Sequence, residues 1–128
     1  MKAQRTGAAE DASIVLFVYG SLKRGQANHS ELRGARFLRA ARTERAFALR
    51  ELAGFPALVP GEASVSGELY AVASADLPLL DEFEGEAYLR RPVQLADGEM
   101  AIAYLARSPR AGAPWPGDEW PDAGHSDD

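Results

Sequence analysis

The sequence predicts an α+β domain in which a small mixed, barrel-like sheet is flanked by a few helices. Three observations lead to this fold class: a continuous apolar run at 14–19, alternating segments further along the chain, and a short helix-like segment at 77–84. Because strands are expected to outnumber helices, a curled sheet is the simplest way to bury the apolar faces. A chain of 128 residues with 46% hydrophobic content is sufficient for one domain with a packed core.

The first part of the chain changes from a polar segment to a buried strand. Residues 1–12 are rich in Ala, Gly and charge and lack periodicity, so we predict a flexible leader before a domain at 13–107. The β-branched and aromatic run at 14–19 is typical of a strand buried on both faces. After the glycine that ends this strand, the segment 28–38 is a candidate helix.

The remaining strands are indicated by alternation and by turn residues. Residues 46–49 alternate as a strand would, before a turn at 54–56. Three further strands are expected, the last two forming a hairpin around Asp97-Gly98: 65–72, 93–95 and 100–105. The segment 108–128 is rich in proline, glycine and acidic residues, and Trp115 and Trp120 are expected to pin parts of it onto the domain.

The composition disfavours several functional classes. The chain has no cysteine, so thiolate nucleophiles and thiolate metal ligands are absent. A net charge of −5 argues against nucleic acid as a partner, because binding to phosphates requires cationic residues. The absence of a long apolar stretch argues against a membrane partner, and the expected location is cytoplasmic. With only two histidines, His29 and His125, we expect no metal site.

Five arginines recur at every third position and form the main exception to the acidic composition. On a helix they would produce a basic stripe that drifts slowly around the surface. We favour a solvated face, because arginines are usually exposed and no aromatic residues are interleaved with them. A partner-binding or nucleic-acid-binding surface is the competing interpretation. These residues are Arg33, Arg36, Arg39, Arg42 and Arg45.

The segment 77–84 predicts a short helix that ends at Gly85 and carries three acidic residues. At 100° per residue its apolar side chains share one arc. Glu84 falls within this arc, at a wheel angle of about 340° when Leu77 is placed at zero. Glu82 lies near about 140°, on the opposite face, and Asp81 lies on the border near about 40°. The arc contains Leu77, Leu79, Leu80 and Phe83.

An inward-facing Glu84 has two interpretations. Desolvation raises the pKa of a buried carboxyl towards neutrality, where the group can accept and return a proton. Alternatively, Glu84 forms an ion pair with a nearby arginine such as Arg90 or Arg91 and has a structural role. The helical wheel alone does not favour either interpretation.

The turn after the first strand is a candidate anion site. Gly20 allows successive backbone N–H groups to face a carboxylate or an oxyanion without a Cβ in the way. The segment GSLKRGQA at 20–27 lacks the Lys-Ser/Thr pair of a phosphate-binding loop, so nucleotide binding is disfavoured. Ser21 lacks the G-x-S-x-G frame of a nucleophile and is more consistent with a turn residue.

Four segments in this order resemble the γ-glutamylcyclotransferase-like (AIG2-like) family, over about residues 14 to 105. They are VYGSLKRG at 18–25, GFPAL at 54–58, VSGELY at 65–70 and LDEFEGEAYLR at 80–90. Each is weak alone, and together they favour the catalytic interpretation of Glu84.

The resemblance implies an enzyme that cyclises a γ-glutamyl amine or peptide to 5-oxoproline by intramolecular acyl transfer, with no cofactor. It implies that Glu84 is the catalytic acid/base, that the turn of Tyr19, Gly20, Ser21 and Leu22 binds the substrate, and that Tyr88 lines the pocket. The alternative is a non-catalytic small-molecule-binding or regulatory module on the same fold. The resemblance leaves open which γ-glutamyl compound is the substrate and what the oligomeric state is.

Overall fold

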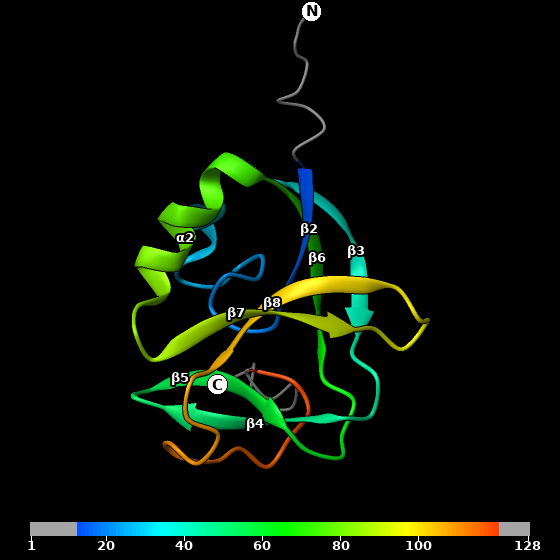
Figure 1. Ribbon diagram of the computed structural model, residues 1–128, viewed down its shortest axis with the longest axis vertical. Helices are drawn as coiled ribbons and strands as arrows, with labels where there is room; N and C mark the ends of the chain where they lie inside the picture. Colours follow the sequence, from blue (N-terminus) through cyan, green and yellow to red (C-terminus); the bar gives the residue numbers. More distant parts are fainter. Residues whose placement is uncertain (1–12, 121–128) are drawn as a thin grey trace, which may run out of the picture.

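The computed structural model describes residues 13–120, whose strands form a single curled sheet (Figure 1). The strands are β2 (Ser13–Val18), β3 (Arg36–Arg42), β4 (Phe47–Leu52), β5 (Phe55–Pro60), β6 (Ser66–Ala73), β7 (Tyr88–Gln94), β8 (Met100–Ala106) and β9 (Ala113–Pro114). The helical segments are η2 (His29–Leu32), η3 (Ser74–Asp76) and α2 (Leu77–Glu84). No helix within residues 13–120 is both long enough and apolar enough to cross a bilayer.

The sheet is mixed, which confirms the predicted fold class. Its strand order is β3-β6-β2-β8-β5-β4-β9, and β7 pairs with β8 beside this path. β8 is parallel to both β2 and β5, whereas the other pairings are antiparallel. Because β3 and β9 stand at opposite ends of this order, the sheet curls like a barrel without closing.

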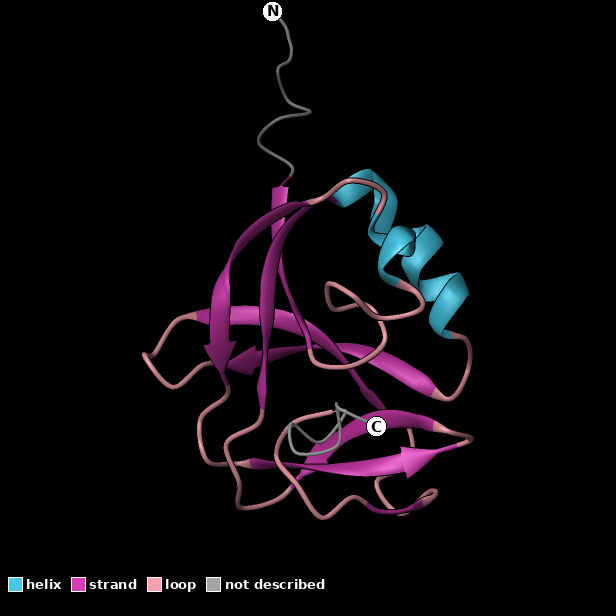
Figure 2. Ribbon diagram, turned by 180° about the vertical axis from the view of Figure 1, so that it is seen from behind, coloured by secondary structure: helices cyan, strands magenta, loops and turns pink. Residues whose placement is uncertain are grey.

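β2 is buried on both faces from Leu16 onward, as the sequence predicts. Phe17 lies in a core cluster on the inner side of the curled sheet, with residues of β4 to β8. Leu16 and Val18 point to the other side and pack in a second cluster with Leu77 and Leu80 of α2. Figure 2 shows the helical segments gathered on that one side of the strands. β2 therefore leads the chain from the interior directly to the turn that follows it.

The helix predicted at 28–38 is wrong. The helical part is only η2, and it ends where Arg33 adopts a left-handed conformation with φ of 57°. The chain then becomes extended and forms β3, because strand pairing with β6 overrides a weak local helical preference. The regular spacing of the arginines therefore produces no helical stripe. Arg39 pairs with Asp97 and Glu99, and Arg42 with Asp118, which neutralises part of this basic run.

The turn predicted at 54–56 is displaced by one residue. β4 and β5 form a two-residue hairpin in which Ala53 and Gly54 have φ of 55° and 88°, the left-handed values of a type I′ turn. Phe55 and Pro56 therefore begin β5 instead of belonging to the turn. The other predicted hairpin, β7–β8 around Asp97-Gly98, is confirmed, and β7 begins earlier than predicted.

The described part of the predicted tail packs on the domain. β9 pairs with β4, and the Trp115 N–H donates to the Leu49 carbonyl at 3.0 Å. Trp115 and Trp120 pack against the inner core cluster with ring centroids 6.3 Å apart, which confirms their predicted role. The predicted leader at 1–12 and residues 121–128 lie outside the described residues.

Candidate active site

A cavity of about 460 Å³ opens between the end of α2, the turn after β2 and the β4–β5 hairpin. All six residues that the sequence assigns to the site line this cavity: Tyr19, Gly20, Ser21, Leu22, Glu84 and Tyr88. They come from three separate parts of the chain, which the curled sheet and α2 bring together. Their individual roles stay predictions.

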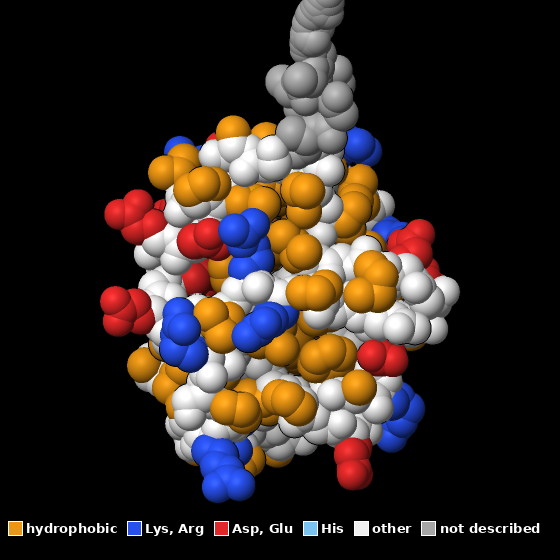
Figure 3. Space-filling model, viewed as in Figure 1, with side chains coloured by type: hydrophobic (Ala, Val, Ile, Leu, Met, Phe, Trp, Pro, Cys, Tyr) orange, Lys and Arg blue, Asp and Glu red, His pale blue; other side chains and the backbone are white. Residues whose placement is uncertain are grey.

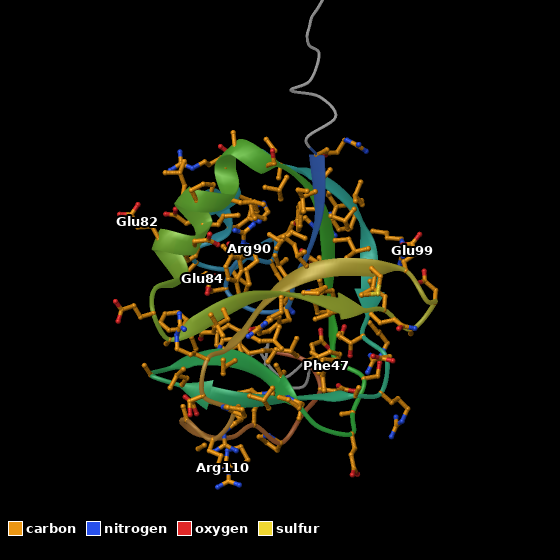
Figure 4. All side chains as sticks on the ribbon, viewed as in Figure 1. Phe47, Glu82, Glu84, Arg90, Glu99 and Arg110 are labelled. Atoms are coloured by element: carbon orange, nitrogen blue, oxygen red, sulfur yellow. The ribbon has the colours of Figure 1, made fainter. Side chains whose placement is uncertain are left out.

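Glu84 is the last residue of α2 and is largely buried. Burial disfavours its charged form and raises its pKa from the ordinary 4.5 to about 7. Figure 4 shows the side chain of Glu84 on the inner side of α2, towards the strands, and that of Glu82 pointing outward. Glu84 is therefore placed to exchange protons near neutral pH.

The ion pair that would give Glu84 a structural role is not formed. Arg90 bonds to Asp81 instead, with 3.0 Å between its Nη2 and the carboxylate Oδ2. Arg91 is exposed, and within residues 13–120 the carboxyl group of Glu84 has neither an ion pair nor a hydrogen bond. The catalytic interpretation gains support, because a buried carboxyl without a partner is costly for the fold and useful mainly for chemistry.

Asp81 fixes the helix that presents Glu84. The Tyr104 hydroxyl of β8 donates to Asp81 Oδ1 at 2.6 Å, and Arg90 of β7 holds the other oxygen. These bonds attach α2 to both strands one turn before its end. The direction of Glu84 is thus set by contacts three residues earlier in the same helix.

The predicted apolar arc of α2 is only partly correct. Leu77 and Leu80 are buried, but Leu79 and Phe83 are 42% and 39% exposed. A helix of two turns contacts the sheet along a narrow stripe, so the outer members of a wide arc remain in solvent. Phe83 instead lines the mouth of the cavity.

The turn after β2 depends on a close approach that only glycine permits. A Cβ on Gly20 would lie 2.4 Å from Cγ of Pro56, which is far inside van der Waals contact. The turn closes with the Lys23 N–H donating to the Gly20 carbonyl at 3.0 Å. The N–H groups of Ser21 and Leu22 have no acceptor within residues 13–120, so they remain available to a ligand.

The two tyrosines of the site use their hydroxyls within the protein. Tyr19 donates to the Tyr104 carbonyl and accepts from the Leu58 N–H at 3.0 Å, and burial raises its pKa well above the ordinary value. Tyr88 donates to the Pro56 carbonyl at 2.9 Å, and burial together with the charge of Glu84 raises its pKa to about 12. Both stay protonated at neutral pH and present ring surface to the cavity.

Asn28 is a cavity residue that the sequence reasoning missed. Its Nδ2 donates to Ser21 Oγ at 2.9 Å, and its own N–H donates to the Ser21 carbonyl at 2.9 Å. The next residue, His29, bonds through Nδ1 to the Leu22 carbonyl at 2.9 Å and so does not activate Ser21. These contacts join residues that are seven positions apart in an irregular loop. A search for helical or strand periodicity in the sequence could not reveal such contacts.

The raised pKa of Glu84 predicts a pH-dependent stability. A group that binds its proton more tightly in the folded state stabilises the fold at low pH, and this contribution is lost as the pH rises from about 4.5 to about 7. Compared with Glu84→Gln, the native protein should lose ~1–3 kcal/mol of unfolding free energy over this interval. Urea unfolding of both proteins at pH 4.5 and pH 8 measures the difference. Parallel pH dependences would show that Glu84 titrates normally.

Comparison with known protein families identifies the chain. The family model described as "Gamma-glutamyl cyclotransferase, AIG2-like" matches residues 16–122. Gamma-glutamylaminecyclotransferase A of Danio rerio is 38% identical over 109 residues, covering 71% of this chain and 68% of that protein. The gamma-glutamylcyclotransferase family protein YtfP of Escherichia coli K12 is 33% identical over 96 residues, covering 73% and 83%.

A curated protein of Vibrio cholerae, whose name also refers to gamma-glutamylcyclotransferase, is 40% identical over 70 residues. The matched region spans 55% of this chain and 61% of that protein. Among solved structures, an AIG2-like protein from Mus musculus matches with a TM-score of 0.73 and 28% identity, covering 84% of this chain and 88% of the mouse chain. The shared fold agrees with the mixed sheet described above. The chain therefore belongs to the gamma-glutamyl cyclotransferase, AIG2-like family.

Proposed function

We propose that the protein cyclises a γ-glutamyl amine or peptide to 5-oxoproline and releases the free amine, with Glu84 as general acid/base. The observation that carries this proposal is the largely buried carboxyl of Glu84, which has no partner among residues 13–120 and shares a cavity with the available N–H groups of Ser21 and Leu22. The family membership of the chain supports the same reaction class.

Substrate binding follows from the charges of a γ-glutamyl group. Its α-carboxylate requires hydrogen-bond donors, which the turn Gly20 to Leu22 supplies as backbone N–H groups. Its α-ammonium requires an acceptor, and Glu84 is the only carboxylate that the described part of the chain, residues 13–120, contributes to the lining. Tyr19 and Tyr88 present their rings to the aliphatic part of the glutamyl chain. Together these contacts would fold the substrate so that its amine approaches its own γ-carbonyl.

The reaction needs two proton movements and no cofactor. Glu84 takes a proton from the α-ammonium, and the freed amine attacks the γ-carbonyl carbon to form the lactam C–N bond. When the γ-amide C–N bond breaks, the departing nitrogen receives the proton from Glu84. The ring nitrogen then gives up a second proton, again through Glu84, to the released amine, which leaves as an ammonium ion. The lactam nitrogen keeps one of the three ammonium hydrogens. Because the attack is intramolecular, effective molarity supplies much of the acceleration.

A panel of γ-glutamyl compounds tests the proposal. The purified protein is incubated with γ-glutamyl amino acids, γ-glutamyl-ε-lysine, glutathione and γ-glutamyl alkylamines, and 5-oxoproline is followed by mass spectrometry. We expect 5-oxoproline from at least one compound, with the free amine in equal amount. Binding without product would support a non-catalytic module instead, and the absence of both would contradict the assignment of the cavity.

A further inference from the structure

We infer that Glu68 is a positioning residue for the substrate turn, Gly20 to Leu22. Its carboxylate lies outside the cavity lining and holds the turn in the conformation that binds the α-carboxylate of a γ-glutamyl group. Glu68 belongs to the segment VSGELY at 65–70, which contributes to the family resemblance and has no part in the reaction described above. This inference rests on the proposed function and adds a residue that acts on the substrate through the turn.

The carboxylate of Glu68 bonds to the backbone directly after the turn. The Arg24 N–H donates to Glu68 Oε1 at 3.0 Å, a contact between residues 44 positions apart in the chain. The preceding N–H, that of Lys23, closes the turn onto the Gly20 carbonyl at 3.0 Å. Within residues 13–120, the two N–H groups available to a ligand are therefore followed by two bonded ones. The second of these bonds attaches the turn to β6.

Glu68 is itself held in place by strand pairing and by Tyr70. It lies opposite Val18, the last residue of β2, so the pairing of β2 with β6 places it beside the start of the turn. The Tyr70 hydroxyl, two residues further along the same face of β6, donates to the same Oε1 atom at 2.9 Å. Because both donors bond to one carboxylate oxygen, the turn and β6 are joined through that atom.

Gly67 allows β6 to approach the end of β2 closely. A Cβ at this position would lie 2.4 Å from the Val18 carbonyl oxygen and 2.7 Å from the ring of Phe17. A larger residue would push the two strands apart and move the carboxylate of Glu68 away from the turn. Gly67, Glu68 and Tyr70 therefore contribute to one and the same contact.

Two cations of the segment after the turn lie near the carboxylate of Glu68. Its Oε2 atom is 3.8 Å from Nε of Arg24, whose guanidinium lies over the ring of Phe37 at 3.8 Å from the centroid. Lys23 is only 8% exposed, and burial lowers its pKa, while the charges of Glu119 and Glu68 act in the opposite direction. Glu68 therefore also favours the charged form of a buried lysine beside the turn.

The burial of Glu68 distinguishes it from acidic residues that are merely solvated. Figure 3 shows acidic side chains projecting from the surface beside α2 and at the β7–β8 turn, where Figure 4 labels Glu82 and Glu99. The side chain of Glu68 is only 17% exposed. A carboxylate that leaves water is costly unless it is hydrogen-bonded, so its bonds to Arg24 and Tyr70 should persist in solution. Loss of this carboxylate should therefore be felt at the turn.

Two compounds that differ only in the α-carboxylate test the inference. γ-Glutamyl-n-butylamine carries this group, and N-butyl-4-aminobutanamide has hydrogen in its place. Both release butylamine, with 5-oxoproline or 2-pyrrolidone as the other product. Glu68→Met removes the acceptor and should raise KM for the γ-glutamyl compound by ~10-fold with kcat changed less than ~3-fold, because the carboxylate is bound in the ground state and in the transition state. KM for the analogue should change less than ~2-fold.

Glu68→Gln and Glu51→Met separate this role from a general effect on the fold. Glutamine keeps an oxygen for the Arg24 N–H but loses the charge near Lys23, so KM should return to within ~3-fold of the native value. Glu51 is exposed on β4 and its side chain has no hydrogen bond or ion pair within residues 13–120, so Glu51→Met should leave KM unchanged. If Glu51→Met raises KM as much as Glu68→Met, or if Glu68→Met affects both compounds equally, the inference is wrong.

Tyr70→Phe provides a second, milder variant in case Glu68→Met folds poorly. It removes the hydroxyl that holds Oε1 and leaves the bond to the turn, so KM for the γ-glutamyl compound should rise ~2–3-fold while that for the analogue stays unchanged. Equal changes for the two compounds would contradict the inference.

Calorimetry with the same two compounds distinguishes the inference from the proposed function, because binding requires no turnover. The native protein should bind the γ-glutamyl compound more tightly, and Glu68→Met should reduce this preference by ~10-fold. This result without any 5-oxoproline from the native protein would reject the catalytic function and support the role of Glu68. Formation of 5-oxoproline by the native protein, with an unchanged preference in Glu68→Met, would support the function and reject the inference.

Discussion

Replacing Glu84 by glutamine is expected to lower kcat/KM for the best γ-glutamyl substrate by at least ~100-fold, because the amide keeps the size of the side chain but cannot move a proton. The fold should persist, since the carboxyl group of Glu84 has no ion pair or hydrogen bond within residues 13–120 that the change would break. The measurement is steady-state formation of 5-oxoproline by both proteins.

Glu82→Gln is the matched control for this experiment. Glu82 lies two residues earlier on α2, is exposed and points away from the strands (Figure 4), so its loss should change kcat/KM less than ~2-fold. In the native protein, kcat/KM should rise as the pH passes the pKa of Glu84 at about 7, and this rise should be absent in Glu84→Gln. Equal activity of the native and Glu84→Gln proteins would refute the assignment of the base.

Tyr19→Phe is expected to lower the free energy of unfolding by ~2–4 kcal/mol, because two buried backbone groups lose their hydrogen-bond partner. The hydroxyl joins the Leu58 N–H of β5 to the Tyr104 carbonyl of β8 across the floor of the cavity. Urea unfolding measures the change. KM should rise only moderately, because the hydroxyl is already occupied within the protein and the ring remains in place.

Tyr70→Phe is the comparison for this second prediction. The Tyr70 hydroxyl donates to the half-buried Glu68 carboxylate at 2.9 Å, so its removal should cost only ~1 kcal/mol. If Tyr19→Phe instead abolished turnover at unchanged stability, the hydroxyl would have to contact the substrate directly. The two measurements thus decide between a structural and a binding role for this side chain.

The sequence predicted the parts of the fold that short-range patterns control. The apolar run of β2, the alternation of β6, the β7–β8 hairpin and the helix α2 are each visible in fewer than about ten neighbouring residues. The inward direction of Glu84 also followed from the helical period. The predicted helix at 28–38 failed because pairing of β3 with β6 is a long-range interaction that no local pattern encodes.

By itself, the sequence determined the fold class, the six candidate residues and the general character of the site. Only the tertiary structure decided that these residues meet in one cavity, that Arg90 pairs with Asp81 instead of Glu84, and that the exposed Phe55 and Phe83 line the same cavity. The physical reason is that partners and burial depend on contacts between distant segments. A pKa, an available amide or an apolar mouth arises only when the curled sheet has brought those segments together.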